Sequence, residues 1–335
     1  MPGHDIIVIG ASAGGVEAIP KLLSKLPLSL AASIFVVLHV SATSKSYLPD
    51  IINKAGGLKA RHARDGDSIQ PGVVYVAPPD QHMLLEDDHV VLDRGAKENR
   101  HRPAIDPLFR TAAHAYGPRV IGIILTGALD DGTLGLQSVK SCGGISIVQD
   151  PADAMVTGMV DSALRYVEVD HKVALKSMPR LIEKLVKTLI PESKLAAHHS
   201  CQTFPVEHKS KRATVTLNEI VKNLGAPSGL ICPDCGGPLW ELDNKGGWRY
   251  TCLVGHTFSP QSFLAAEGDE LERALWVAIK TLEERSSVLK RIAQRPGQTN
   301  GAGITKSLLA KAREFEEQAT LIRSIIRRLE LPKDN

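Results

Sequence analysis

Short apolar runs alternate with longer amphipathic stretches from residue 5 to about residue 190. The apolar runs are rich in β-branched residues and predict strands over 5–11, 33–40, 72–78, 120–127 and 145–150. Several are apolar almost throughout, which is typical of parallel strands that are buried on both faces. Stretches with helical spacing lie between them, over 15–25, 107–116, 132–141 and 172–188. This alternation predicts an α/β fold with a doubly wound, mostly parallel sheet.

One segment departs from this alternation. Residues 83–93, MLLEDDHVVLD, form two short apolar runs around acidic turn residues. Such a pattern predicts a β-hairpin.

The regular pattern ends near residue 190. Residues 191–228 are polar and without a sustained period, so we expect a linker, in which 217–225 has the pattern of a short helix. Helical stretches over 268–294 and 305–330 flank the loop sequence RPGQTNGAG. The predicted organisation is an α/β domain over 1–190, the linker over 191–228, a small Cys/His module over 229–266 and an α-helical hairpin over 267–335.

The last helical stretch carries an apolar seam with a 4-3-4-3 spacing, formed by Leu308, Ala312, Phe315, Ala319, Ile322, Ile326 and Leu329. Packing inside the hairpin is the favoured interpretation. Because the spacing is that of a coiled coil, self-association or docking on a helical partner is the alternative.

Composition excludes several classes of protein. A formal net charge of +3 over 335 residues is too small to make nucleic acid or an anionic membrane the main partner. No apolar run approaches the ~20 residues that span a bilayer. The N-terminal sequence MPGHDIIVIG lacks the basic region and cleavage site of a signal peptide. We therefore expect a cytoplasmic protein that binds no nucleic acid and is not inserted into a membrane.

A glycine-rich turn, GASAGG, follows the first predicted strand at residues 10–15. It does not fit a dinucleotide-binding turn, because Ser12 stands where the second glycine should be and no acidic residue ends the strand over 33–40. Gly10–Gly14 instead has the G-x-S-x-G spacing of a nucleophile elbow. The backbone N–H of Ala13 would then face a developing oxyanion. The alternative is that Ser12 simply caps the following helix.

Two further strand ends supply the groups that a nucleophilic serine needs. His39 ends the second predicted strand, and Asp130 and Asp131 follow the strand over 120–127. Ligands bind outside the carboxyl ends of strands in open α/β sheets. The three strand ends therefore predict a Ser-His-Asp constellation at one edge of the sheet. Spacing alone does not choose between Asp130 and Asp131.

Six motifs resemble, in order, the catalytic domain of the bacterial chemotaxis protein-glutamate methylesterases: IVIGASAGGVEAI, VVLHV, YVAPPDQHM, RHRPAIDPLFRTAA, GIILTGALDDGTLG and GGISIVQDPADA. The resemblance covers roughly residues 3–190. It implies hydrolysis of γ-glutamyl methyl esters on methyl-accepting chemoreceptors or related methylated signalling proteins, and in many members deamidation of glutamines. It also implies that the triad is Ser12, His39 and Asp131, because the family aspartate directly precedes a glycine.

The resemblance further implies how the site works. Ser12 would attack the ester carbonyl, His39 would accept its proton, and Asp131 would orient the imidazole. Backbone N–H groups at Ala13 and Ala128 are candidates for the oxyanion hole. Many members carry an N-terminal receiver domain; this sequence starts at the first catalytic strand, so control by phosphorylation in cis is not expected.

Some positions depart from the family pattern. Ala128 stands where methionine is common, which leaves two alternatives open: a receptor-binding adaptor without turnover, and a serine esterase for another substrate. Arg100, His101 and Arg102 could steer an acidic helix of a substrate toward the site, or form a solvated loop. Asp106, before a proline, has the pattern of a helix N-cap.

The cysteine pattern predicts a metal site outside the α/β domain. CPDC supplies Cys232 and Cys235, and CLVGH supplies Cys252 and His256. This spacing is typical of a structural zinc site in a zinc-ribbon-like module, with four ligands and no open position for catalysis. A redox C-x-x-C pair is the alternative. We expect no cofactor for the hydrolysis itself.

Overall fold

The computed structural model describes residues 3–197, 225–244, 247–295 and 302–329. The chain divides into two compact units, Met1–Phe263 and Leu264–Asn335. The first unit contains the sheet and the Cys/His module. The short helix predicted over 217–225 lies outside the described residues except for Gly225.

A parallel sheet of seven strands forms the centre of the first unit, in the order β3-β4-β2-β1-β7-β8-β9. The strands are β1 (Ile6–Ala11), β2 (Ser33–Leu38), β3 (Lys59–His62), β4 (Val73–Val76), β7 (Val120–Ile124), β8 (Ile145–Gln149) and β9 (His171–Val173). Ile6 at the start of β1 lies opposite Ser33 of β2 and Val120 of β7, so these three strands end close together. The predicted α/β class and the five predicted strands are confirmed.

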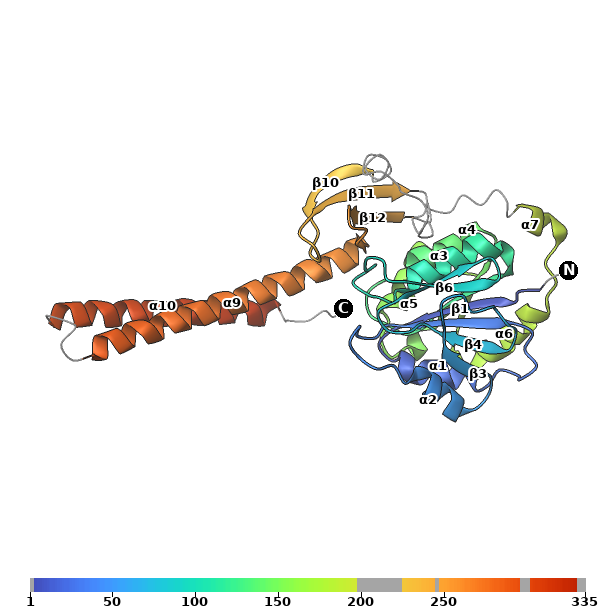
Figure 1. Cartoon of the computed structure of the whole chain (residues 1–335), viewed down its shortest axis with the longest axis horizontal. Helices are drawn as coiled ribbons and strands as arrows, with labels where there is room; N and C mark the ends of the chain where they lie inside the picture. Colours follow the sequence, from blue (N-terminus) through green and yellow to red (C-terminus); the bar gives the residue numbers. More distant parts are fainter. Residues whose placement is uncertain (1–2, 198–224, 245–246, 296–301, 330–335) are drawn as a thin grey trace. The chain divides into compact units, whose positions relative to one another are not determined.

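Helices cover both faces of this sheet (Figure 1). One face packs against α3 (Ile105–Tyr116), α4 (Thr133–Ser141) and α5 (Gly158–Tyr166). The other packs against α1 (Gly15–Leu23), α2 (Leu48–Ala55) and α6 (Met178–Lys187). Alternate residues of β1 serve the two cores: Val8 joins the first, and Ile7 and Ile9 join the second. The sheet is therefore buried on both faces, as its apolar strands require.

Two predicted boundaries can be judged directly. The hairpin over 83–93 is confirmed as β5 (His82–Glu86) paired antiparallel with β6 (His89–Asp93). The helix predicted over 172–188 is wrong at its start, because 171–173 form the edge strand β9 and α6 begins only at Met178. The short helix α7 (Glu192–Ala197) follows α6.

The Cys/His module is a four-stranded antiparallel sheet, in the order β10-β11-β12-β13. Its strands are β10 (Ala226–Ile231), β11 (Pro238–Asn244), β12 (Gly247–Cys252) and β13 (Thr257–Phe258). A small aromatic core stabilises it: Phe263 packs against the rings of Tyr250 and Phe258, with ring centroids 5.3 and 6.2 Å apart.

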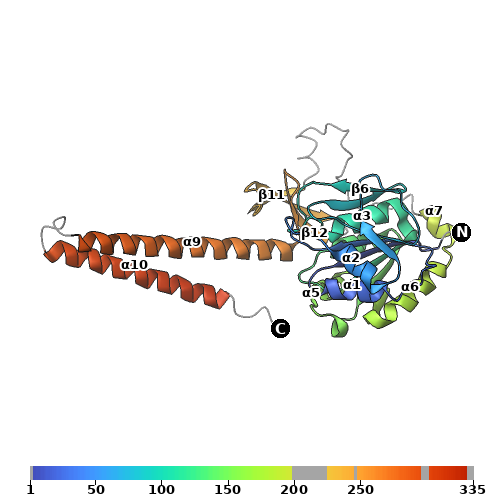
Figure 2. The ribbon, with the colours of Figure 1, turned by 60° about the horizontal axis from the view of Figure 1, so that its bottom comes forward.

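The second unit is a hairpin of two long helices. α9 (Pro260–Gln294) enters it, and α10 (Ala302–Leu329) lies beside α9 in both views (Figures 1 and 2). Ala319 and Ile326 of the predicted seam are buried in one cluster with Ile279 of α9. The seam is therefore used for packing inside the hairpin. Within the described parts of the chain, no helix combines the length and apolarity that crossing a membrane requires.

Candidate active site and metal centre

Ser12 occupies a sharp turn between β1 and α1. Gly14 in this turn has a φ of 81°, and a Cβ there would lie 2.9 Å from Met155 Cβ and 3.0 Å from Thr126 Oγ1. Only glycine fits both the backbone angle and the space. The N–H of Ser12 donates to the carbonyl of Thr126 at 3.0 Å, which ties the turn to the end of β7.

A second glycine makes room for the serine itself. A Cβ at Gly127 would lie 2.9 Å from Ser12 Cβ and 2.1 Å from Met159 Sδ. Any larger residue at 127 would therefore push against both side chains.

His39 and Asp131 form a buried pair. His39 Nε2 lies 2.7 Å from Asp131 Oδ2, and the two side chains are only 5% and 3% exposed. A carboxylate can only accept, so Nε2 carries the proton of a neutral ring. The other ring nitrogen, Nδ1, is buried and has no hydrogen-bond partner among the described residues. The imidazole is thus oriented by Asp131 and retains one nitrogen that can take up a proton.

Asp131 accepts hydrogen bonds from five donors. His39 Nε2 and the N–H of Ile105 reach Oδ2, both at 2.7 Å. Asn99 Nδ2 and the N–H groups of Gly132 and Asp106 reach Oδ1 at 2.9, 3.0 and 3.3 Å. Burial alone would raise the pKa of Asp131, but the hydrogen bond from His39, the positive charge that His39 carries when it is protonated, and the bonds from Ile105 and Asn99 lower it to about 2. Asp131 is therefore a carboxylate over the whole working pH range.

Asn99 and Asp106 belong to the group of donors around Asp131, which we call its cradle. The sequence did not identify either as a site residue. Asn99 Nδ2 also donates to Asp106 Oδ2 at 2.9 Å, and the N–H of Gly135 donates to Asp106 Oδ1 at 2.7 Å. The predicted N-cap is wrong: α3 begins at Ile105, so Asp106 lies inside its first turn. Burial, and then the charge of Asp131, raises the pKa of Asp106 well above its ordinary value.

Asp130 points to a different partner. Its Oδ1 accepts a hydrogen bond from Ser259 Oγ at 2.8 Å, and His39 contacts Asp131 instead. Burial raises the pKa of Asp130 to about 6, although the bond from Ser259 opposes the shift. Ser259 belongs to the segment after β13, and no local pattern pointed to it.

The loop over 100–102 is engaged with its surroundings. The ring of His101 stacks on that of His39, with centroids 3.7 Å apart. Arg102 donates to Asp80 Oδ1 through Nη2 at 2.6 Å and to the carbonyl of Gly95 at 2.6 Å. Arg100 is half-buried, with a φ of 73°. The predicted role of both arginines in steering a substrate stays a prediction.

The predicted oxyanion donors lie on the surface of the site. Ala13 and Ala128 are both exposed. In the part of the chain that the structure describes, their N–H groups make no hydrogen bond, which leaves them available to a substrate oxygen.

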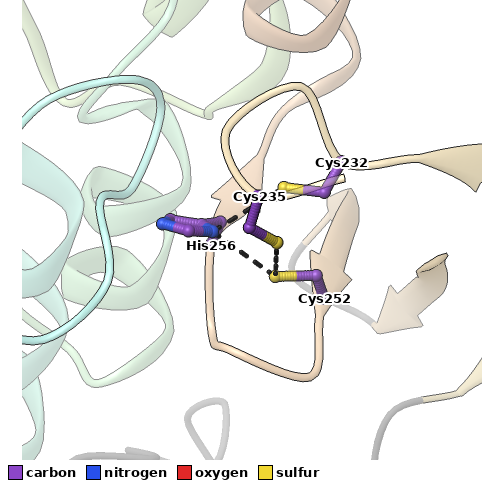
Figure 3. A group of neighbouring side chains, drawn as sticks. All are labelled: Cys232, Cys235, Cys252 and His256. Atoms are coloured by element: carbon purple, nitrogen blue, oxygen red, sulfur yellow. Dashed lines mark hydrogen bonds between the residues drawn. The ribbon is translucent and has the colours of Figure 1, made fainter. Parts of the chain in front are cut away.

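The four predicted metal ligands point toward one another (Figure 3). The ligand atoms of Cys232, Cys235, Cys252 and His256 all lie within 4.8 Å of one another. Sγ of Cys235 and Sγ of Cys252 are 3.7 Å apart, and His256 Nδ1 lies 3.7 Å from Cys232 Sγ and 3.6 Å from Cys252 Sγ. Tetrahedral zinc bonds of ordinary length separate two sulfurs by about 3.8 Å and a sulfur from a nitrogen by about 3.6 Å. The residues therefore fit a tetrahedral ion.

Two tight turns bring these ligands together. The N–H of Cys232 donates to the carbonyl of Gly237, and that of Gly236 donates back to Cys232, both at 2.8 Å. The N–H of Cys252 donates to the carbonyl of His256 at 3.0 Å. Burial lowers the pKa of His256, which favours the neutral ring that a metal binds.

Known proteins resemble the first part of this chain. The family model described as CheB methylesterase matches residues 7–182. A putative protein-glutamate methylesterase/protein-glutamine glutaminase of Leptospira interrogans is 39% identical over 183 residues, 54% of this chain and 95% of that protein. Protein-glutamate methylesterase/protein-glutamine glutaminase 4 of Anaeromyxobacter dehalogenans is 38% identical over 174 residues, but the match spans only 49% of that protein.

A solved structure agrees with these sequences. The crystal structure of the Thermotoga maritima CheB methylesterase catalytic domain matches with a TM-score of 0.53 and 33% sequence identity. The match covers 55% of this chain and 100% of the Thermotoga maritima chain. The matched family model ends at residue 182, so the Cys/His module and the helical hairpin lie beyond it.

Proposed function

This chain belongs to the CheB methylesterase family, and from that premise we propose that it hydrolyses γ-glutamyl methyl esters on methylated chemoreceptors. The observation that carries the proposal is the 2.7 Å pair of His39 and Asp131, which leaves His39 Nδ1 without a partner among the described residues. Ser12, on a glycine-lined turn at the neighbouring strand end, supplies the nucleophile.

The reaction proceeds in two halves. Ser12 Oγ bonds to the ester carbonyl carbon while His39 Nδ1 takes the hydroxyl proton, and Asp131 stabilises the resulting imidazolium. His39 then returns the proton to the leaving methoxide, methanol departs, and a glutamyl-serine ester remains. Water attacks that ester, His39 takes the proton of the water and passes it to Ser12, and the free carboxylate is released.

The developing oxyanion is held by backbone donors. The N–H groups of Ala13 and Ala128 are the proposed pair, and Ala13 lies just before the first turn of α1, where the helix dipole favours negative charge. A primary amide would pass through the same acyl-enzyme with ammonia as the leaving group. Glutamine deamidation is therefore part of the proposal.

Methanol release from methylated chemoreceptor membranes tests the proposal. Ser12→Ala and His39→Gln should each lower kcat by roughly 10³-fold or more, because a triad loses most of its power when one member is removed. Ser24→Ala is the matched control, since Ser24 follows the far end of α1 and its hydroxyl bonds only to the carbonyl of Lys21 in the described chain. No methanol from the folded wild type would instead favour the adaptor, or an esterase for another substrate.

We propose zinc as the ion of the Cys/His module, held by Cys232, Cys235, Cys252 and His256. Three thiols and one imidazole at tetrahedral distances are the ligands that zinc prefers. Four protein ligands leave no position for water, so the ion would stabilise the module and take no part in hydrolysis. Metal analysis of the purified chain should find one zinc per chain, and Cys235→Ser should lower that content.

Location and assembly complete the proposal. We propose that the chain acts in the cytoplasm, where reducing conditions would keep the thiols of the module available as metal ligands. Self-association through the helical hairpin stays a prediction, which the mass of the full-length chain in solution would test.

A further inference from the structure

The Cys/His module pairs with the loop that carries Asn99. The N–H of Thr257 donates to the carbonyl of Lys97 at 3.2 Å, and the N–H of Asn99 donates to the carbonyl of Thr257 at 2.8 Å. Thr257 directly follows His256, one of the four candidate metal ligands. The residue that pairs with the loop is therefore the direct sequence neighbour of a candidate metal ligand.

The side-chain amide of Asn99 joins the module to the cradle of Asp131. Its oxygen accepts from the N–H of Ser259 at 2.9 Å and from Ser262 Oγ at 3.1 Å. Its nitrogen donates to Asp131 and Asp106, both at 2.9 Å. An amide oxygen only accepts and an amide nitrogen only donates. The two bonds from the module therefore fix which end of the amide faces the carboxylates.

Ser259 makes a second contact with the site. Its Oγ donates to Asp130, the neighbour of Asp131, and accepts from the N–H of Ser262 at 3.0 Å. Asn99, Ser259 and Ser262 are 4%, 5% and 0% exposed. Water is therefore a poor substitute for any of these bonds.

We propose that Asn99 is a positioning residue for the triad, and that the metal-loaded module sets its orientation. The inference rests on the proposed function. The contacts run without a gap from His256 through Thr257 and Asn99 to Asp131, and from there to His39. Loss of the metal would loosen the segment over 257–262 and free the amide to rotate. Asp131 would then lose a donor and hold the imidazole less firmly.

Two serines allow a test that spares the metal ligands and the triad. The double variant Ser259→Ala/Ser262→Ala removes the Ser262 hydroxyl that donates to Asn99 and the Ser259 hydroxyl that donates to Asp130. The amide oxygen of Asn99 then keeps only one of its two bonds from the module, that from the N–H of Ser259. Ser228→Ala is the matched control, because Ser228 lies in the same module and its hydroxyl bonds to Leu239 instead. All variants are prepared as the full chain and checked for one zinc per chain.

Two readouts separate positioning from general loss of structure. For methanol release, the double variant should lose roughly 10-fold in kcat with KM changed less than about 2-fold, because orientation acts on the chemical step. In proton NMR, the Nε2–H signal of His39, assigned by its loss in His39→Gln, should shift or broaden. Ser228→Ala should change neither. A zinc-loaded double variant with unchanged kcat and unchanged His39 signal would overturn the proposal.

Removal of zinc from the wild type provides the second arm. A chelator should shift or broaden the His39 signal as the double variant does, and should change the double variant itself much less. An unaltered signal in the metal-free wild type contradicts the proposal. If the chelated chain unfolds as a whole, the zinc-loaded double variant decides alone. Absence of methanol from the wild type counts against the proposed function only, since the NMR signal does not depend on turnover.

Discussion

The rings of His39 and His101 lie parallel, with centroids 3.7 Å apart and planes inclined by 9°. Burial, and then the charge of His39, lowers the pKa of His101 to about 3. His101 is therefore neutral near pH 7 and puts no positive charge against His39. Its ring covers one face of the proposed base.

Replacing His101 should impair the proposed hydrolysis through the position of His39. His101→Ala removes the stacked ring, so kcat for methanol release should fall roughly 10-fold. His101→Phe keeps a flat, uncharged ring and should recover most of that loss. His114→Ala, at an exposed position of α3, is the control. Equal rates for His101→Ala and the wild type would show that the stacking has no role in catalysis.

The lowered pKa of His101 also predicts how the stability of the folded chain changes in acid. The ordinary histidine pKa is 6.5, and the pKa of His101 in the folded chain is about 3. Between these two pH values His101 is protonated in the unfolded chain and neutral in the folded chain. The contribution of His101 to stability is therefore lost as the pH falls from 6.5 toward 3. His101→Phe should be stabilised relative to the wild type by on the order of 2 kcal/mol on going from pH 7 to 4.5. Urea unfolding at both pH values measures this.

Asp130 should show the opposite sign. Its folded pKa is about 6 against an ordinary 3.8, so the folded chain binds the proton more tightly and gains stability as the pH falls from 6 to 3.8. Asp130→Asn lacks this gain and should be destabilised relative to the wild type over that range, again by on the order of 2 kcal/mol. If the free energy of unfolding changed equally with pH in the variant and the wild type, the raised pKa of Asp130 would be contradicted.

The sequence predicted the centre of the sheet better than its edges. β1, β2 and β7 are buried on both faces and are therefore apolar almost throughout. The edge strands β3 and β9 have the sequences KARH and HKV, which carry no such signal because one side of each strand has no neighbour. Strand propensity that depends on a neighbour cannot be read from a short polar segment.

The site shows the same division. Ser12, His39 and Asp131 follow central strands, so the topology of an α/β sheet was enough to bring them to one edge. Asn99 carried a weak signal, as the residue directly before the RHRPAID motif. Ser259 carried none, because its contact with Asp130 spans 129 positions and depends on where the module docks.

Gly127→Ala should damage both stability and the proposed activity. The added methyl would meet Met159 Sδ at 2.1 Å and Ser12 Cβ at 2.9 Å. Overpacking of this kind costs about 1–3 kcal/mol, and displacement of Ser12 should lower kcat. Gly268→Ala in α9 is the control, because a Cβ there meets nothing within 4 Å. It should stabilise the chain by about 0.5–1 kcal/mol through helix propensity.

The second variant at this position separates the two effects. Gly127→Ala/Met159→Ala removes the sulfur but keeps the contact with Ser12. Met159→Ala alone is the reference, because Met159 is fully buried and its loss leaves a cavity. In that background Gly127→Ala should cost less stability than it does in the wild type, while kcat stays low. A full recovery of kcat would show that Met159, and not Ser12, transmits the damage.

Substitutions of the proposed zinc ligands should change the zinc content according to the chemistry of the new side chain. Cys252→Ser replaces a thiolate with a weaker ligand at a buried position, so zinc content should fall well below one per chain and the free energy of unfolding should fall with it. His256→Cys keeps four ligands of the kinds that structural zinc sites use and should retain the metal. Metal analysis after dialysis against a weak chelator, with Ser228→Ala as the control, measures both. Zinc retained equally by Cys252→Ser and the wild type would place the ion elsewhere in the chain.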